Sequence, residues 1–419
     1  MNILLINSPI IWVGKKRPIF PLGLASIGTF LENYGHNVRL IDLNSCVNHL
    51  QELQKLLQKN RFDFIGVSIR SIFFRNTPQT HQLISVVKKV KFISPDSKII
   101  CGGAAFSLAS REIMDSIEEV DAGVIGRGEK ALLELIQKPP HEVKGIVFRN
   151  GKDIHFTPPR EEINLEDLPI PKRNWPDLDL SQYDTLNLQT RQGCPFECRY
   201  CQFKYFEGAK MRYRNLSSVH KEIDYLSSFK RKIFFVDNIF NYPVVYSLEI
   251  INILKKYNLE WGGYFRANLL NKAYIEELSK AGCKTIIISA ESGSQSIHNY
   301  LNTGISVNEI LNLLPYCSSL ARDKITVQFG FMIGMPKEKI IDVVRTFILI
   351  IKILFKRCSI GLALFVYSPQ SEIGREELCK RDKVSVFSRT SFLHKKIFYP
   401  LYWLFVLFDF IVVQKLKIR

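Results

Sequence analysis

The sequence predicts an α/β protein with two successive α/β units and a short basic and apolar C-terminal extension. Short apolar runs alternate with helical patterns over residues 1–138 and again over residues 184–375, and such alternation is typical of parallel sheets covered by helices. The chain of 419 residues is too long for one simple core, and its apolar fraction of 46% is that of a globular protein. We therefore expect two domains, a linker at 139–183 and a helical extension at 376–419.

The first unit alternates strands and helices regularly. Strands are expected at 3–7, 38–42, 64–69, 98–101 and 122–125, with helices at 22–34, 50–58, 78–92 and 108–117. This order predicts a doubly wound, Rossmann-like sheet, whose ligands bind beyond the carboxyl ends of the strands. The candidate contacts in those loops are Asn7, Ser8, Ser68, Ser71, Gly102, Gly103, Gly126, Gly128 and Glu129. None of the loops is a Gly-x-Gly-x-x-Gly fingerprint, so a nicotinamide or flavin dinucleotide is not indicated.

The second unit contains six strand-like segments. They are expected at 185–190, 232–237, 261–266, 285–289, 326–333 and 360–366, with helices at 217–229, 244–257, 272–281 and 339–355. This pattern predicts a partial (β/α)6 barrel, in which the loops after the carboxyl ends of the strands carry the chemistry. The stretch at 139–183 before it is punctuated by prolines and weakly periodic, which argues against a long element there.

Three cysteines follow the first strand of this barrel. Cys194, Cys198 and Cys201 have the spacing Cys-x3-Cys-x2-Cys, with Tyr200 just before the last. Three thiolates in one loop can hold three irons of a [4Fe-4S] cluster, which is normally held by four cysteines. The next cysteine is Cys283, so the fourth iron would be open to a small-molecule ligand, as in a catalytic centre. The alternatives are a zinc site, which usually takes four protein ligands, and buried apolar cysteines.

The cysteine run resembles the signature of the radical S-adenosylmethionine (SAM) enzymes, and the first unit resembles the cobalamin-binding domain often found ahead of them. The second resemblance rests on segments 21–25, 35–42, 102–103 and 126–129. The Asp-x-His-x-x-Gly motif of many cobalamin proteins is missing, so the resemblance implies cobalt without a histidine ligand. The alternative is a degenerate domain kept for its shape or for contact with a partner.

The resemblance also implies a set of SAM contacts along the barrel. Asp237 and Asn238 stand where the family often has Gly-Gly-Glu, and a helix N-cap pair is the alternative. A guanidinium such as that of Arg266 suits the carboxylate of SAM or of the substrate. Segment 291–294 matches the family's Glu-Ser-Gly-Ser element, and 330–336 resembles its glycine-rich strand beside adenine. The implied contacts are Tyr200, Asp237, Asn238, Arg266, Glu291, Ser292, Ser294, Gly330, Ile333 and Gly334.

The implied activity is that of an enzyme with a [4Fe-4S] cluster, SAM and cobalamin. In the family, reductive cleavage of SAM gives a radical that attacks unactivated carbon, and cobalamin carries a methyl group. We expect methylation of an unactivated carbon, or of phosphorus, in a small molecule or lipid, with a ferredoxin or flavodoxin as reductant. The alternatives are a cobalamin-dependent rearrangement or cyclisation and an electron-transfer or sensor protein. The nucleoside motifs at 291–294 and 330–334 argue against a mere relay.

The charge of the chain is +17 and is concentrated toward its end. Residues 380–419 hold nine Lys/Arg and two Asp, and they include the aromatic and apolar run 397–413. This composition favours an interfacial helix on anionic lipid, with a packed helix or a true span as alternatives. We see no aromatic-basic motif for nucleic acid. We expect no secretory signal and a cytoplasmic location, with the inner face of the membrane as a refinement.

Overall fold

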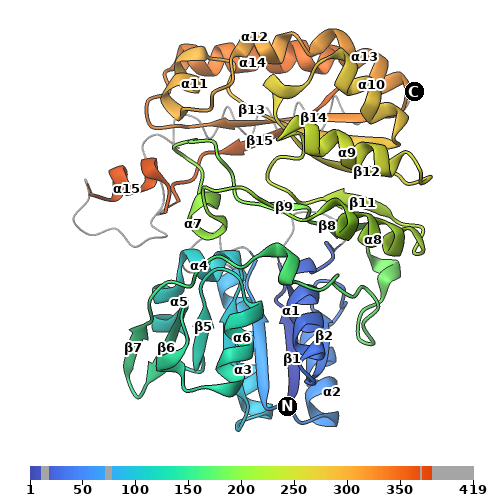
Figure 1. Ribbon diagram of the computed structural model, residues 1–419. Coiled ribbons are helices and arrows are strands. Elements are labelled where there is room, and N and C mark those ends of the chain that lie inside the picture. Colours follow the sequence, from blue (N-terminus) through green and yellow to red (C-terminus); the bar gives the residue numbers. More distant parts are fainter. Residues whose placement is uncertain (11–17, 71–77, 369, 380–419) are drawn as a thin grey trace. The chain divides into compact units, whose positions relative to one another are not determined.

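The computed structural model describes residues 1–10, 18–70, 78–368 and 370–379, and its chain divides into two compact units (Figure 1). The first is built on Met1–Leu186, with Tyr205–Gly208 added from later in the chain. The second is built on Asn187–Lys204 and Ala209–Lys380. Both units are α/β, as the sequence predicts.

The first unit is a seven-stranded sheet in the order β2-β1-β3-β4-β5-β6-β7. Its strands are β1 (Asn2–Asn7), β2 (Asn37–Asp42), β3 (Phe64–Ser68), β4 (Lys98–Gly102), β5 (Ala122–Val124), β6 (Ile146–Asn150) and β7 (Asp153–Phe156). Its helices are α1 (Leu22–Asn33), α2 (His49–Lys59), α3 (Pro78–Ile93), α4 (Ala104–Leu108), α5 (Ser110–Ser116) and α6 (Glu129–Gln137). Figure 1 shows helices on both faces of this sheet.

The strands β1 to β5 pair in parallel, and the helices that connect them cover both faces of the sheet. The side chains from Ile3 to Ile6 are at most 1% exposed, as expected for a strand between two helical layers. In the register, Asn7 lies opposite both Asp42 and Ser68. The polar residues predicted to contact a ligand therefore end their strands at one edge of the sheet.

The last two strands of this sheet lie inside the stretch predicted as a linker. Strands β6 and β7 form an antiparallel hairpin, with Asn150 opposite Asp153, and β6 pairs antiparallel with β5. The turn between them contains Gly151, whose φ of +61° suits glycine. The dipeptide Asn150-Gly151 is a hairpin signal that the sequence analysis did not use. The single helix expected at 108–117 is two short helices, and α6 was not anticipated.

The second unit contains a six-stranded sheet in the order β15-β14-β13-β12-β11-β8. Its strands are β8 (Thr185–Leu188), β11 (Lys232–Phe235), β12 (Trp261–Phe265), β13 (Cys283–Glu291), β14 (Thr326–Ile333) and β15 (Ser359–Leu364). Its helices of nine or more residues are α8 (Leu216–Ser227), α9 (Val244–Leu254), α10 (Lys272–Lys280), α13 (Leu314–Arg322) and α14 (Ile340–Phe355). Shorter helices are α11 (Gln295–Leu301), α12 (Val307–Leu311) and α15 (Glu372–Cys379), and α7 (Phe203–Glu207) begins in this unit and ends in the first.

Strands β11 to β15 pair in parallel, so their carboxyl ends lie together along one rim. Helices α10, α13 and α14 lie along the outside of this sheet in Figure 1. A cluster of aromatic rings holds β11 and β12 together, with the Phe240 ring 4.7 Å from Phe235 and 5.0 Å from Trp261. This packing fixes the strand ends from which the predicted site residues project.

No helix within the described ranges is long and apolar enough to cross a membrane. The aromatic run 397–413, for which membrane contact was predicted, lies outside the described residues. The predicted C-terminal extension is therefore described only as far as α15.

Candidate active site

The base of the cysteine loop is closed by a short hairpin. Strand β9 (Arg191–Gln192), which directly follows β8, pairs antiparallel with β10 (Arg212–Tyr213). Gln192 lies opposite Arg212, so residues 193–211 form a closed loop that contains all three cysteines. A loop whose two ends are paired presents its side chains from a fixed position.

Asp237, which follows β11, fastens this base. Its Oδ1 accepts hydrogen bonds from the backbone N–H of Thr190 at 2.7 Å and of Arg191 at 3.1 Å. Its Oδ2 accepts the Thr190 hydroxyl at 2.6 Å and lies 3.4 Å from Arg191 Nε. The side chain is fully buried, and burial raises the pKa of Asp237 against the opposing effects of Arg191 and Thr190. The structure thus places this predicted SAM contact in the support of the loop, with Asn238 partly buried beside it.

The middle of the loop is anchored by Arg199. Its backbone N–H donates to Leu301 O at 2.9 Å, while its guanidinium donates to Glu372 at 2.6 Å and to Glu376 at 2.5 Å. The backbone N–H of Ile373 in turn donates to Arg199 O at 3.1 Å. Helices α11 and α15 therefore hold the segment between the second and third cysteines, a role that the sequence analysis did not assign.

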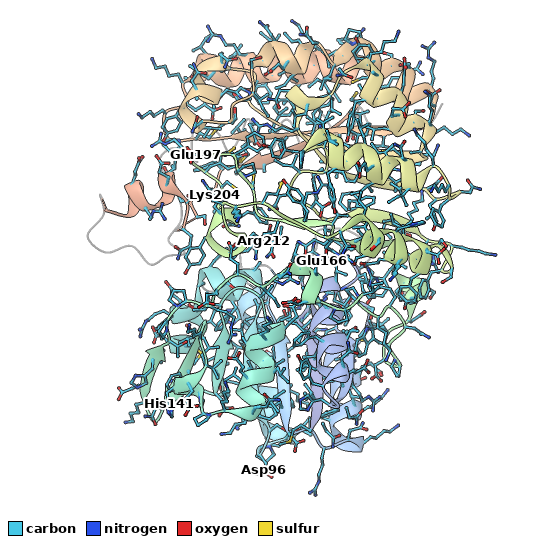
Figure 2. The ribbon with its side chains drawn as sticks, viewed as in Figure 1. Asp96, His141, Glu166, Glu197, Lys204 and Arg212 are labelled. Atoms are coloured by element: carbon cyan, nitrogen blue, oxygen red, sulfur yellow. The ribbon has the colours of Figure 1, made fainter. Side chains whose placement is uncertain are left out.

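A second set of contacts holds the loop one residue before Cys198. Asn302, in the left-handed region at φ +51°, donates from Nδ2 to Glu197 O at 3.1 Å. Figure 2 labels Glu197 and Lys204, whose Oε1 and Nζ lie 3.5 Å apart across the loop. Asn302 is the C-cap of α11 and begins the Asn-Thr-Gly turn, so the carboxyl end of α11 supports the cysteines.

The three cysteines form no disulfide, and their side chains are partly buried. Burial raises the pKa of Cys198 to about 11. The negative charges of Cys201 and Glu291 add to this effect, and the positive charge of Arg266 opposes it. Burial also raises the pKa of Cys201, and the charge of Cys194 adds to the effect. The thiols thus lie within electrostatic reach of one another, and ionising them together requires a positively charged partner.

A [4Fe-4S] cluster fits this donor set better than a single metal ion does. Over the part of the chain that the structure describes, no three His, Cys, Asp or Glu side chains are gathered as the ligands of one ion would be. A cluster binds each thiolate to a different iron, so its cysteines need not converge on one point. Three soft thiolates are suited to such a cluster when their loop is held in place, as it is here by the β9–β10 hairpin, Asp237, Arg199 and Asn302.

Tyr200 and Glu291 join the cysteine loop to the end of β13. The Tyr200 hydroxyl donates to Glu291 Oε1 at 2.5 Å, and the Glu291 side chain is 6% exposed. Glu291 lies at φ +56°, beside a register shift between Ser289 and Glu291. Burial raises the pKa of Glu291 to about 7, although the hydrogen bond from Tyr200 opposes this. A carboxyl group in this state can both accept and donate hydrogen bonds to a polar ligand.

Arg266, which follows β12, lies over the same loop. Its guanidinium is 3.7 Å from the centre of the Phe196 ring, and it donates to Thr303 O. Its backbone is held by Asn241, which accepts from Arg266 N at 2.9 Å and donates to Arg266 O at 3.0 Å. Arg266 is 6% exposed, and its Nε finds no acceptor among the described residues. A buried cation with a donor to spare suits an anionic group such as a carboxylate.

Ser292 and Ser294 turn toward α14. The Ser292 hydroxyl lies 3.0 Å from Thr346 Oγ1, and the Ser294 hydroxyl donates to Asp342 Oδ1 at 2.5 Å. A Cβ on Gly293 would lie 2.4 Å from Arg345 O, so only glycine fits between the serines. Close packing against α14 therefore explains why the residues after Glu291 in the Glu-Ser-Gly-Ser element are small. These contacts occupy both hydroxyls that were predicted to contact SAM.

The glycines of the fifth barrel strand leave open space, but Ile333 lies on the opposite face. A Cβ on Gly330 would meet only Ile288 O at 3.8 Å, and one on Gly334 would meet nothing within 4 Å. Side chains alternate along a strand, so Met332 shares the face of Gly330, and Ile333 is fully buried on the other side. The structure therefore does not bring Ile333 together with the predicted adenine face.

Glu338 holds the loop after β14 and was missed by the sequence analysis. Its Oε2 accepts from the backbone N–H of Gly334 at 2.5 Å and of Met335 at 3.2 Å. Burial raises the pKa of Glu338 to about 7, and no partner of its Oε1 is found in the described part of the chain. The only sequence signal for this role is a Glu four residues after Gly334. Its meaning depends on the conformation of the loop, which the sequence does not give.

The carboxyl edge of the first sheet is a network around Asp42, which the sequence analysis also missed. Asp42 accepts from Asn7 Nδ2 at 2.8 Å, from Asn44 N at 3.0 Å and from the Tyr183 hydroxyl at 2.8 Å. Ser8 donates its hydroxyl to Ser68 O at 2.8 Å. Three of the residues predicted to contact cobalamin thus lie together, while Ser71 lies outside the described residues.

The remaining predicted cobalamin contacts lie at the ends of β4 and β5. At Gly103, with φ +97°, a Cβ would lie 2.7 Å from Ile69 O, whereas one on Gly126 would meet nothing within 4 Å. Gly102 ends β4, and a Cβ on Gly128 would lie 2.6 Å from Ile27 of α1. The open backbone at Gly126 leaves room for a bulky ligand such as cobalamin at this edge.

Glu129 begins α6 and is used for internal packing. It accepts the Ser26 hydroxyl at 2.7 Å and an Arg127 guanidinium nitrogen at 2.6 Å, and it is 2% exposed. Burial opposes ionisation, but Arg127 and Ser26 together lower the pKa of Glu129. The carboxylate therefore connects α6 to α1 instead of projecting from the sheet edge.

Two family models match the chain. The B12 binding domain model matches residues 16–136, and the Radical SAM superfamily model matches residues 188–350. The first range ends in α6 and the second runs from the end of β8 into α14. Each family model thus falls on one of the two sheets.

Curated relatives share about a quarter of their residues with the chain. An uncharacterised methyltransferase of Pyrococcus horikoshii is 24% identical over 339 residues, covering 78% of this chain and 71% of the relative. The hopanoid C-3 methylase of Methylococcus capsulatus is 25% identical over 337 residues, covering 75% and 61%.

A solved structure with a similar fold is the radical S-adenosylmethionine methyltransferase TsrM of Kitasatospora setae, which contains cobalamin and a [4Fe-4S] cluster. It matches with a TM-score of 0.79 and 18% identity, over 92% of this chain and 79% of that one. At this identity the match establishes the order of the two sheets and their topology.

Proposed function

Because this chain is a radical SAM enzyme that carries an N-terminal B12-binding domain, we propose that it methylates an unactivated carbon of a small molecule or lipid. Its cofactors are a [4Fe-4S] cluster, SAM and cobalamin. The observation that carries the proposal is the order of the two domains, since relatives named as methyltransferases match most of the chain, across both of them.

The cofactors supply the reactivity, a carbon radical and a transferable methyl group, while the protein supplies binding, orientation and exclusion of water. We assign the thiolates of Cys194, Cys198 and Cys201 to the cluster. Their support by Asp237 and Arg199 favours this assignment, because a loop held on both sides keeps its ligands in place.

For SAM we assign two groups beside the cysteine loop. Glu291 suits the ribose hydroxyls or the ammonium group, because its carboxyl is buried and receives only a few donors from the protein. Arg266 suits the carboxylate, since it is a buried cation with a free Nε donor among the described contacts. Gly330 and Gly334 leave room for the adenine, and Met332 replaces Ile333 as the side chain beside it.

The roles of Ser292, Ser294 and Asp237 are proposed to be positioning. The two serine hydroxyls connect the turn after β13 to α14, and Asp237 secures the loop base. For cobalamin we propose the sheet edge formed by Asn7, Ser8, Ser68, Gly102, Gly103, Gly126 and Gly128, with Glu129 acting through α6.

For the substrate class we propose a lipid. The name of the Methylococcus relative is that of a methylase of hopanoids, and its similarity to this chain supports a lipid acceptor. An external reductant is required, because reductive cleavage of SAM consumes an electron that has to be delivered to the cluster. We propose a ferredoxin or flavodoxin for this role.

The test uses the full chain, reconstituted anaerobically with iron, sulfide and cobalamin and supplied with a chemical reductant and with SAM that carries a deuterated methyl group. Cell extract is divided into lipid and aqueous fractions, and both are searched by mass spectrometry. We expect a deuterated methyl group in the lipid fraction, with 5′-deoxyadenosine and S-adenosylhomocysteine formed in equal amounts. The Cys198→Ala variant is the control and should form neither.

Other outcomes separate the alternatives. Deuterium in the aqueous fraction alone would retain methyl transfer and overturn the lipid assignment. Formation of 5′-deoxyadenosine without S-adenosylhomocysteine would overturn methyl transfer in favour of rearrangement or cyclisation. Neither product, from a protein with an intact cluster, would contradict SAM cleavage altogether.

A further inference from the structure

The outer face of α14 carries an exposed apolar stripe. Six large apolar side chains on this helix are between 43% and 82% exposed, and they are Ile340, Ile341, Val344, Ile348, Ile351 and Phe355. At about 100° per residue they fall within one sector about 100° wide. The opposite side of the helix, with Val343, Leu349 and Ile353, is buried against the sheet. Packing against the sheet explains the apolar residues on the buried side of α14. It does not explain the apolar residues on the exposed side.

A row of cations runs along one edge of this stripe. Arg345, Lys352 and Lys356 follow at spacings of seven and four residues, which places them next to each other just beyond the apolar sector. Lys337, Lys339 and Arg357 add exposed positive charge at the two ends. Within 337–357, all of which the structure describes, the acidic residues are Glu338 and Asp342, and both are 4% exposed and hydrogen-bonded inward.

We propose that this face of α14 binds the surface of an anionic lipid bilayer. Exposed isoleucine and phenylalanine side chains beside a row of Lys and Arg are the pattern of helices that lie in the membrane interface. Negatively charged headgroups complement a face edged by Arg345, Lys352 and Lys356, with three further exposed cations at the ends of the helix and no exposed acid within 337–357. The helix has 16 residues, fewer than the roughly 20 needed to span, so it lies on the bilayer.

The sequence beyond the described residues has the same chemistry. Residues 380–419 hold nine Lys/Arg against two Asp and include the aromatic run 397–413. Two weak anchors on one protein bind a membrane far more firmly than either one, because attachment of the first raises the local concentration of the second. The proposal for the α14 face rests on described residues, and it does not depend on the chemistry proposed above.

The first test is sedimentation of the full chain with vesicles of phosphatidylcholine alone or mixed with phosphatidylglycerol. We expect binding to the anionic vesicles only, weakened by added salt. The double variant Ile348→Asp/Phe355→Asp and the double variant Arg345→Glu/Lys352→Glu should each reduce the binding constant about ten-fold or more. The matched control is Val245→Asp, an exposed apolar residue of α9 (70% exposed), which should bind as the wild type does.

The second test identifies the occupant directly. A photoreactive p-benzoylphenylalanine replaces Ile348 in the full chain, which is irradiated with and without anionic vesicles. Adducts with phosphatidylglycerol support the proposal. A cross-link to residues 397–413, or to a second copy of the chain, formed equally with and without vesicles would show that the face is covered by protein and would overturn it. Wild-type binding by both double variants would overturn it as well.

Discussion

Two buried carboxylates at the rim of the second sheet differ in what they bind. Asp237, after β11, receives two backbone N–H groups, a hydroxyl and a guanidinium, and its side chain is fully buried. Glu291, at the end of β13, is hydrogen-bonded among the described side chains by Tyr200 and Ser289 only, and burial raises its pKa to about 7. The comparison teaches that a saturated carboxylate supports a loop, whereas a sparsely bonded one beside that loop is available to a ligand.

The largest effect on activity is expected when a cysteine of the loop beside these two carboxylates is replaced. Cys198→Ala should abolish the cluster and lower SAM cleavage at least about a thousand-fold, because no other side chain can take over an iron. The measurement is iron and sulfide content together with 5′-deoxyadenosine formation. Cys46→Ala, a partly buried cysteine of the first unit, is the control and should keep both. An intact cluster in the Cys198 variant would contradict the ligand assignment.

Removal of the saturated carboxylate should be costly for stability. Asp237→Ala leaves the buried Arg191 without its ion pair and two backbone donors unsatisfied, and we expect a loss of about 3–5 kcal/mol in the unfolding free energy. Urea denaturation of the second unit, followed by tryptophan fluorescence, measures it. Asp323→Ala, at an exposed position, should change little. If Asp237→Ala lowered the unfolding free energy by less than about 1 kcal/mol, the supporting role assigned to Asp237 would be contradicted.

Removal of the sparsely bonded carboxylate should act on SAM instead. Glu291→Gln keeps the size of the side chain and removes its charge, so the cluster should load normally while the affinity for SAM falls about ten- to hundred-fold. Titration of the reduced cluster with SAM, followed by EPR, gives the affinity. Asp237→Asn should remain within about three-fold of wild type once its cluster is loaded. A larger loss of SAM affinity in Asp237→Asn than in Glu291→Gln would contradict the assignment of Glu291 to SAM.

A smaller effect is expected at Glu338, whose pKa in the folded protein is raised to about 7 from 4.5. The folded state therefore holds the proton more tightly than the unfolded state, and stability falls as the pH rises from 4.5 through about 7. Glu338→Gln should remove this loss and gain about 2 kcal/mol above that range. Thermal unfolding across the range measures it, with Glu142→Gln, an exposed carboxyl, as the control. An unchanged pH dependence would show that Glu338 does not titrate there.

Much of the fold was predictable because it rests on local patterns. The strands β1 to β5 of the first sheet and all six strands of the second lie where apolar runs were found, and the cysteine loop follows the first barrel strand as expected. The hairpin of β6 and β7 was missed although Asn150-Gly151 signals it. Ile333 was predicted beside the adenine from a motif, and the alternation of side chains along β14 places Ile333 on the face opposite Gly330.

The contacts that define the site were not predictable, because they join distant parts of the chain. Tyr200 and Glu291 are 91 residues apart, and no local pattern connects them. The hydroxyls of Ser292 and Ser294 contact α14 for the same reason, and only the packing of that helix reveals it. Sequence motifs thus locate the loops that bear chemistry, and the structure decides which side chain in each loop supports it.

The most direct test of the account is the EPR spectrum of the full chain, reduced with its cluster and cobalamin in place, with and without SAM. The account predicts a [4Fe-4S] signal that SAM shifts, with cobalamin retained, and a shift that requires a much higher SAM concentration in Glu291→Gln. A signal that SAM leaves unchanged in the wild type would contradict an open iron beside Glu291, and with it the proposed radical methyl transfer.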